Sequence, residues 1–304
     1  METSKLRAAL AAFCLLCSSA VAAQAPQMGP LIFDIDGGAV HQSMTDLKDG
    51  EGSFAVDHWF VSAGITYAWD RRNAIGFTLG GGRSSYEFDG LTGSAGSEPW
   101  NKIEDTRAAI TGRFSFSDKG TAIIIPTVRF NGEEGASSSD SRTFGLFAAA
   151  AWRIDEDLTI GPGIGVFSRL EDGNRIFPIL VIDWNISERW NLSTGRGLAA
   201  SQGPGLSLSY TLNQNWSFGL SGRYENVEFR LDDEGAAPGG VGRDRSLPLV
   251  ASAILDINPT IKLSVFAGLE FGGELRLKDV MDVTVEESEY DPAPLFGATF
   301  AIRF

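Results

Sequence analysis

A histidine two residues before a serine is the first arrangement in this chain that could do chemistry. The chain holds two histidines, His41 and His58, and Ser43 lies just after the first. A histidine can activate a serine hydroxyl for nucleophilic attack when an acid orients the imidazole ring. Acids that could do so here are Asp34, Asp36 and Asp57. Because any histidine near a serine-rich loop gives this pattern, we predict no enzyme. Instead, we expect His41 at the end of a loop and His58 as an interior hydrogen-bonding residue.

Charged side chains also recur at alternate positions inside otherwise apolar segments. Successive side chains of a β-strand point to opposite faces, so residues two apart share a face. The residues that we predict to line an interior are Arg107, Arg113, Arg129, Arg153, Asp183, Arg223, Glu225, Glu270 and Arg303, together with Asp34, Asp36 and His58. In a barrel lumen, facing arginines and carboxylates hold water and can set the selectivity of a pore. The alternative is a hydrogen-bonded interior with no path through it.

The chain contains no defined metal or phosphate site. Acidic residues at 232–234 and 286–287 could attract Ca²⁺, but they lack the ligand spacing of a calcium loop. The glycines at 76 and 80–82 are not followed by the lysine of a phosphate loop, and they fit a bent or closely packed strand. We therefore expect no cofactor. The formal net charge of −14 argues against nucleic-acid binding, which needs a basic face.

The elements that must position these residues are predicted to be strands. Between residues 107 and 117, Ile110, Phe114 and Phe116 alternate with Thr111 and Arg113. Similar alternation predicts strands at 31–40, 54–70, 74–88, 104–117, 121–131, 142–154, 158–170, 175–186, 190–199, 204–212, 216–230, 245–257, 261–277 and 294–304. The count is about fourteen, an even number as in bacterial barrels. It falls to about twelve if 31–40 is a leader and a weak segment such as 190–199 merges with a neighbour.

Short and long connections alternate along the chain. Short polar turns lie at 71–73, 118–120, 155–157, 187–189, 213–215 and 258–260, and longer segments lie at 89–103, 131–141, 232–244 and 278–293. Bacterial outer-membrane barrels have short turns on one side and long loops on the other. Tryptophans beside the short turns, such as Trp69 and Trp184, fit an interfacial girdle. A soluble sandwich or lipocalin-like barrel would instead bury the apolar face. We predict an all-β fold, a transmembrane antiparallel up-and-down β-barrel.

The first residues are predicted to be a cleaved secretory signal peptide. Lys5 and Arg7 form a positive region, residues 8–17 are apolar, and small residues at 20–23 offer a cleavage site. Cys14 and Cys17 lie within this segment, so the exported chain would hold no disulfide. We expect a signal peptide at 1–23 and one barrel domain at 24–304. The barrel would lie in the outer membrane of a Gram-negative cell, with both termini periplasmic.

The last predicted strand alternates apolar residues and stops on an aromatic one. Phe296, Ala298, Phe300, Ile302 and Phe304 share one face. This pattern is similar to the C-terminal signature of outer-membrane proteins. The similarity implies that Phe300, Ile302 and Phe304 form the segment that the barrel-assembly machinery recognises by strand addition. We expect this strand to pair with the strand at 31–40 and so close the barrel.

The C-terminal third resembles an uncharacterised, porin-like family of Gram-negative outer-membrane β-barrels, known as a domain of unknown function. The resemblance rests on Gly222–Glu225, Phe229–Asp233, Pro238–Gly242, Gly272–Leu277 and Ala293–Phe304. The N-terminal half matches only in general pattern. The resemblance implies the barrel fold and no particular activity.

The sequence leaves several functions open. We favour a porin-like channel for small solutes or a structural barrel, with Phe147, Phe177 and Phe266 narrowing the lumen. The alternatives are an outer-membrane lipid hydrolase that uses His41 and Ser43, and a surface-interaction barrel that acts through its long acidic loops. The expected partners are outer-membrane lipids and lipopolysaccharide, and the assembly machinery during biogenesis.

Overall fold

The computed structural model describes residues 30–48, 52–91, 98–171, 173–194 and 205–304, and within them sixteen strands form one sheet. The first eight are β1 (Leu31–Asp46), β2 (Ser53–Ala68), β3 (Ala74–Asp89), β4 (Lys102–Ser115), β5 (Gly120–Glu133), β6 (Arg142–Arg153), β7 (Leu158–Ser168) and β8 (Asn174–Asn185). The others are β9 (Trp190–Thr194), β10 (Gly205–Thr211), β11 (Trp216–Arg223), β12 (Glu225–Arg230), β13 (Val241–Asp256), β14 (Ile261–Lys278), β15 (Thr284–Tyr290) and β16 (Ala293–Arg303). Among these residues, no helix is long and apolar enough to cross a membrane.

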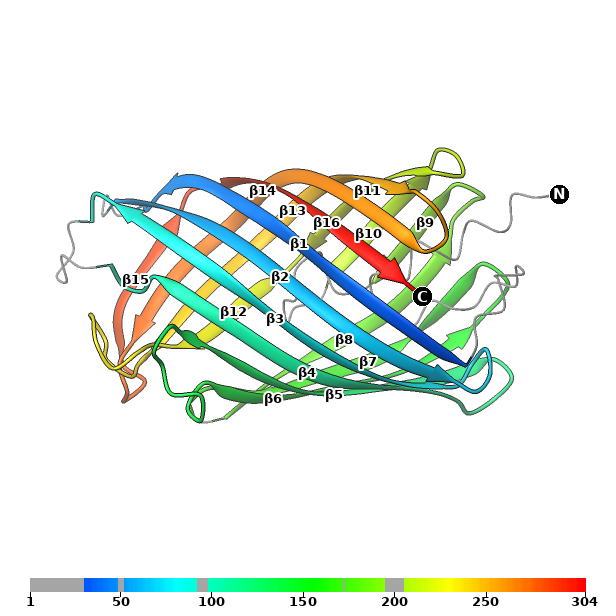
Figure 1. Cartoon of the computed structure of the whole chain (residues 1–304), viewed down its shortest axis with the longest axis horizontal. Helices are drawn as coiled ribbons and strands as arrows, with labels where there is room; N and C mark the ends of the chain where they lie inside the picture. Colours follow the sequence, from blue (N-terminus) through cyan, green and yellow to red (C-terminus); the bar gives the residue numbers. More distant parts are fainter. Residues whose placement is uncertain (1–29, 49–51, 92–97, 172, 195–204) are drawn as a thin grey trace.

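The sheet closes into a barrel (Figure 1). Each strand from β1 to β10 pairs antiparallel with the next, and the ring continues from β11 through β13, β14 and β16 back to β1. Fourteen of the described strands make up this ring. β12 and β15 add no further position to it, because β11 and β12 pair with successive parts of β13, and β15 and β16 pair with successive parts of β14. Closure pairs the backbone groups that an open edge would expose, as a membrane requires. The predicted barrel of about fourteen strands is confirmed.

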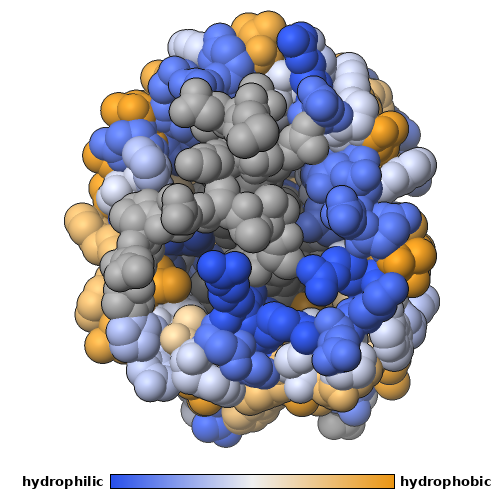
Figure 2. Space-filling model, turned by 90° about the vertical axis from the view of Figure 1, so that its right-hand side faces the viewer, coloured by the Kyte–Doolittle hydropathy of each residue, from blue (hydrophilic) through white to orange (hydrophobic). Residues whose placement is uncertain are grey.

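The exterior of the barrel is apolar, and its interior is mixed. On β3, Phe77 and Leu79 are 47% and 52% exposed, and Ile110 on β4 is 47% exposed. Their strand neighbours Thr111 and Arg113 are buried inside. Looking onto the right-hand end of Figure 1, Figure 2 shows apolar residues around the outer margin and hydrophilic residues nearer the centre. This arrangement is that of a transmembrane barrel, in which alternate residues face lipid and lumen.

Side-chain caps organise the short turns. Asn258 accepts backbone hydrogen bonds from Thr260 and Ile261 through its side-chain oxygen, each 2.8 Å long. The same arrangement occurs at the other short turns, whose first residues are Asp70, Ser117, Asp155, Ser187 and Asn213. Such side chains stabilise a turn by mimicking its backbone hydrogen bond. These turns lie at the barrel end where the amide of Phe304 donates to the carbonyl of Phe33 at 2.8 Å.

The opposite end departs most from the predicted strands. The predicted loop 278–293 contains β15, β1 runs on to Asp46, and β13 begins at Val241 rather than at residue 245. The predicted strand 190–199 is described only as β9, since residues 195–199 lie outside the described part of the chain. The predicted strand 216–230 breaks at Tyr224. Beyond this residue, β12 still pairs with β13, but the pairing with β10 has ended at Arg223.

The bend lets the sheet close a second time. Arg230 at the end of β12 bridges to Gly132 of β5, and Leu47 just after β1 bridges to Tyr290 of β15. Together with the neighbouring pairs, these bridges form a smaller ring at the end opposite the short turns, through β12–β15, the end of β1, and β2–β5. Within the described residues, β6–β11 and β16 belong to the large ring alone. The interior is therefore divided at this end.

Candidate functional site

The smaller ring encloses an apolar core. Phe229 on β12 and Phe54 on β2 are fully buried, and Tyr290 is 2% exposed. Trp100 packs edge-on against Phe229, with ring centroids 5.1 Å apart. Other members of this cluster are Leu47, Val56, Tyr86, Phe88, Ile103, Leu231, Ala237, Leu275, Leu277 and Ala293. Interiors packed in this way leave few voids that could hold a water molecule, so side chains of the described residues fill the smaller ring.

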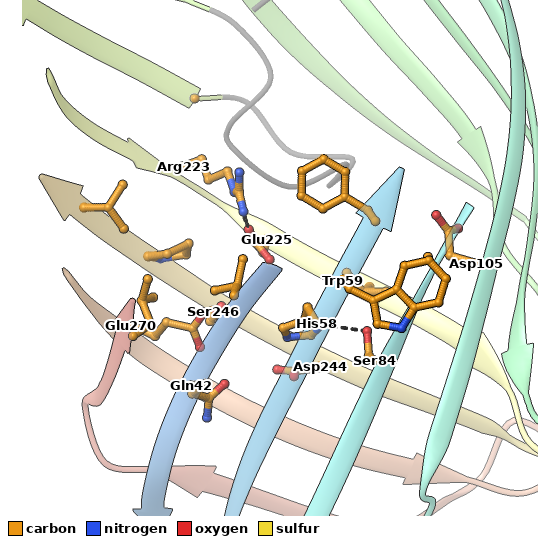
Figure 3. A pocket seen from close by; sticks show the side chains of 18 of the residues that line it. Gln42, His58, Trp59, Ser84, Asp105, Arg223, Glu225, Asp244, Ser246 and Glu270 are labelled. Atoms are coloured by element: carbon orange, nitrogen blue, oxygen red, sulfur yellow. Dashed lines mark hydrogen bonds and ion pairs between the residues drawn. The ribbon is translucent and has the colours of Figure 1, made fainter. Parts of the chain in front are cut away.

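A cavity of about 140 Å³ lies inside the barrel beside this core. One wall is apolar and contains Val250, Phe266 and Leu295. The other walls carry polar groups, and Figure 3 shows Gln42, His58, Ser84, Asp244, Ser246 and Glu270 around one space. The cavity is thus built from strands far apart in the sequence, which only closure of the barrel brings together.

Hydrogen bonds fix most of the polar groups of the cavity. Nδ1 of His58 lies 2.6 Å from Oγ of Ser84 on the next strand. The hydroxyls of Tyr86 and Tyr290 donate to the two carboxylate oxygens of Asp244, at 2.9 and 3.2 Å. Charge-assisted hydrogen bonds of this kind are stronger than neutral ones, so Asp244 is held in one orientation.

Several of the predicted interior charges lie at this cavity. Arg129 on β5 forms an ion pair with Asp105, and Arg223 forms one with Glu225 where β11 meets β12. Glu270 on β14 lines the cavity opposite its register partner Pro248. Sequence parity puts Arg129, Arg223, Glu225 and Glu270 on the interior face, but it does not predict that they meet at one cavity or which charge pairs with which.

The other predicted interior charges lie elsewhere in the barrel. The side chain of Arg107 lies over Gly80 of β3. A Cβ added at Gly80 would stand 3.1 Å from Nε of Arg107. Arg113 is buried near the short turns, and Asp183 accepts a 2.8 Å hydrogen bond from Asn191. Arg303 stands opposite Asp34 in the β1–β16 register, and Arg153 is exposed at the end of β6. These five residues do not belong to the cavity.

The predicted aromatic residues lie on both faces. Phe147 and Phe266 are buried inside, and Phe177 stacks on Phe167 with ring centroids 5.7 Å apart. Phe304 is 58% exposed on the outer face, whereas Phe300 covers Gly37 of β1, where an added Cβ would meet its ring at 2.9 Å. Ile302 pairs with Ile35 of β1 and Ile261 of β14. The final strand thus closes the barrel, as predicted.

Ion pairs connect β12 to the wall formed by β7 and β8. Arg230 donates to Glu171 at 2.7 Å and to the carbonyls of Leu170 and Asp140, each at 3.1 Å. Arg175 at the start of β8 donates to Glu228 at 2.9 Å. We call Arg230, Glu171, Arg175 and Glu228 the β12 bridge. It spans the part of the barrel end that the smaller ring leaves outside.

His41 and Ser43 do not line the cavity. His41 points to the outer side of β1, where its Nδ1 lies 2.8 Å from Oδ1 of Asp57 on β2. Its ring contacts Phe296, with centroids 5.1 Å apart. Of the three acids considered for this histidine, Asp57 is therefore the one beside it. His58, by contrast, faces inward, as predicted.

Sequence reasoning missed Gln42, Ser84, Tyr86, Asp244 and Tyr290. The predicted loop 232–244 includes Asp244, because glycines precede this residue, although Asp244 shares the parity of Ser246 and Val250 on β13. Gly242 is needed there because the ring of Phe229 lies on it, 2.1 Å from where a Cβ would stand. Extending the alternation backwards by one step would have placed Asp244 in the interior.

No protein-family model matches the chain, and no curated protein matches it in sequence. Among solved structures, an outer-membrane channel from Pseudomonas putida aligns with 11% identity and a TM-score of 0.46, over 93% of this chain and 100% of that one. A Pseudomonas aeruginosa FadL homologue aligns with 11% identity and a TM-score of 0.45, over 90% of each chain. The P. putida toluene transporter TodX aligns with 9% identity and a TM-score of 0.45, over 92% and 90%. The fold assignment rests on the closed ring of hydrogen-bonded strands, and the family resemblance of the C-terminal third stays a prediction.

Proposed function

We propose that this protein is an outer-membrane channel of a Gram-negative bacterium that admits small solutes one at a time. The observation that carries the proposal is the cavity of about 140 Å³ inside a barrel whose outer face is apolar. A volume near 150 Å³ accommodates a molecule about the size of benzene. The solute route passes beside the apolar core, between β12 and the β6–β8 wall, and is crossed by the β12 bridge.

This arrangement favours a narrow, gated path over a general porin. Wide porins keep a water-filled lumen, whereas here Phe229 and its neighbours fill the smaller ring. The remaining passage is crossed by Arg175–Glu228 and Arg230–Glu171. A solute that crosses the barrel therefore needs β12 to move.

The orientation and the partners follow from the same proposal. The short turns and Phe304 face the periplasm, and the end that carries β12 and β15 faces the cell exterior, as in other bacterial barrels. Outer-membrane lipids and lipopolysaccharide contact the apolar face. The assembly machinery recognises the exposed Phe304, together with Phe300 and Ile302, by strand addition. Deleting Phe304 should lower the yield of assembled barrel in cells, and an unchanged yield of heat-modifiable protein would remove this assignment.

Conductance measurements test the channel directly. Purified protein in a planar lipid bilayer should show brief, small openings rather than the steady conductance of a wide porin. The control is the same protein heat-denatured before addition, which should show no openings. If folded protein, verified by its heat-modifiable mobility on a gel, never conducts and never admits small solutes into vesicles, the channel proposal is wrong.

A second candidate function rests on the hydrogen bond between His41 and Asp57. An acid-oriented histidine near Ser43 on the outer face could act on a lipid ester. Lipid hydrolysis by the purified protein should then be lost in Ser43→Ala and in His41→Ala. Hydrolysis that survives Ser43→Ala would exclude this serine as the nucleophile.

A further inference from the structure

The carboxyl groups of the cavity outnumber its cations. Four carboxylates line it, and two of them are neutralised by arginine, as Arg129–Asp105 and Arg223–Glu225. The remaining two, Asp244 and Glu270, take part in none of the ion pairs of the described residues. Arg223 lies within electrostatic reach of Glu270 and also pairs with Glu225, so one cation faces two carboxyl groups. Arg83, the third arginine that lines the cavity, pairs with Glu104.

A buried carboxylate without a cation is costly, because water no longer stabilises its charge, so such a group either takes up a proton or pairs with a cation that enters the site. The hydroxyls of Tyr86 and Tyr290 orient Asp244 but bring no positive charge. The described residues hold no group of three His, Cys, Asp or Glu side chains that could hold a metal ion, and Asp244 and Glu270 supply only two carboxyl groups. The missing charge therefore fits an organic cation better than a metal ion.

A second observation also points to a ligand. Gln42 lines the same cavity and is only 2% exposed, yet its Nε2 has no hydrogen-bond partner among the described residues. Buried amide groups are normally paired, because an unpaired one loses its hydrogen bonds to water and gains none in return. A ligand that fills this cavity therefore carries an acceptor atom for Gln42, in addition to the positive charge.

The apolar wall supplies the third requirement. Val250, Phe266 and Leu295 are 4–7% exposed and form one packed group along the cavity. Such a wall gains free energy by covering hydrocarbon rather than water. An entirely polar solute would leave it uncovered.

We propose that the cavity binds a small organic amine that carries a short apolar portion and an acceptor oxygen. The ammonium lies between Asp244 and Glu270, the hydrocarbon covers Phe266 and Val250, and the oxygen accepts from Nε2 of Gln42. This inference rests on the channel proposed above, for which the cavity is the binding station along the route. An overall acidic protein also raises the local concentration of cations at its entrance.

Isothermal titration calorimetry on the protein in detergent micelles tests the site with matched ligands. We choose 4-amino-1-butanol, 1,4-butanediol and 4-hydroxybutanoate, which are similar in size and carry positive, zero and negative charge. The amine should bind at least tenfold more tightly than the diol, and the carboxylate should bind most weakly. Equal affinity for the three compounds would overturn the proposal without any variant.

Isosteric variants then locate the charge. Asp244→Asn and Glu270→Gln keep an acceptor oxygen for the tyrosines and should each weaken the amine about ten- to a hundredfold, with little effect on the diol. Glu289→Gln, which removes an exposed acid outside the cavity, is the control and should leave binding unchanged. Gln42→Leu should weaken 4-amino-1-butanol but not pentylamine, which has no oxygen to lose. Unchanged amine affinity in folded Asp244→Asn and Glu270→Gln proteins would refute the site. Conductance that persists in such a case would leave the channel proposal standing, so the two failures are distinguishable.

Discussion

Substituting Arg230 by alanine should release β12 from the opposite wall of the barrel. The guanidinium makes hydrogen bonds to Glu171 and to the carbonyls of Leu170, Asp140 and Gly239, and its side chain is only 11% exposed. Phe229, the residue just before Arg230, remains buried in the apolar core. The variant therefore loosens the bridge without removing the packing that holds the smaller ring.

The magnitude follows from these contacts. Breaking a buried ion pair costs about 3–5 kcal/mol. Because Glu171 is 21% exposed and water can partly replace its partner, we take a lower range of about 2–3 kcal/mol. Applied to the equilibrium between a held and a released β12, this raises the released population roughly 30- to 150-fold. The open probability of single channels should rise by up to that factor, while the conductance of one open channel changes little.

Single-channel recording in planar bilayers measures both quantities. Lys48→Ala is the matched control, because it removes an exposed ion pair with Glu289 of β15 at the same end of the barrel. Its open probability should equal that of the unmodified protein. If folded Arg230→Ala protein shows the same open probability as the control, β12 is not the barrier and the reasoning fails.

Three further predictions concern stability and the bridge. Phe229→Ala should lower the free energy of unfolding by about 3–5 kcal/mol, because it empties a fully buried site, and urea denaturation in lipid vesicles measures the change. Asn258→Ala should cost about 1 kcal/mol by the same assay, because two turn amides lose their acceptor, whereas Asn258→Asp should restore most of it. Glu228→Gln should raise the open probability less than Arg230→Ala does, since it weakens the contacts with Arg175 and Arg169 but keeps a side-chain oxygen that accepts a hydrogen bond. An open probability equal to or above that of Arg230→Ala would contradict this order.

The features that the sequence predicts well are those set by neighbouring residues. Alternation of side chains along one strand decides which residues face lipid, so Ile110 and Arg113 are placed correctly without knowledge of any other strand. The short turns are equally local, because an Asn or Asp side chain bonds amides two and three residues ahead. Closure by the last strand is predictable because an unpaired edge is not tolerated in lipid.

Contacts across the lumen are not predictable in this way. Arg230 reaches Glu171 and Gly132 only because the chain bends at Tyr224, and nothing in the alternation of 216–230 signals a bend. The residues Tyr86, Asp244 and Tyr290 come from β3, β13 and β15, and their meeting depends on the curvature of the whole sheet. Parity therefore predicts the inside of the barrel, but it does not predict the site within it.

The division of the interior explains why the site lies where it does. A lumen that was polar throughout would hold water and bind small solutes weakly, and one that was packed throughout would admit none. Here Phe229 and Tyr86 belong both to the apolar core and to the wall of the cavity. Strand β12 thus packs Phe229 into the apolar core on one face and carries Glu228 and Arg230 of the β12 bridge on the other. A displacement of β12 must change both the cavity and the passage beside it, so solute binding and opening are expected to be coupled.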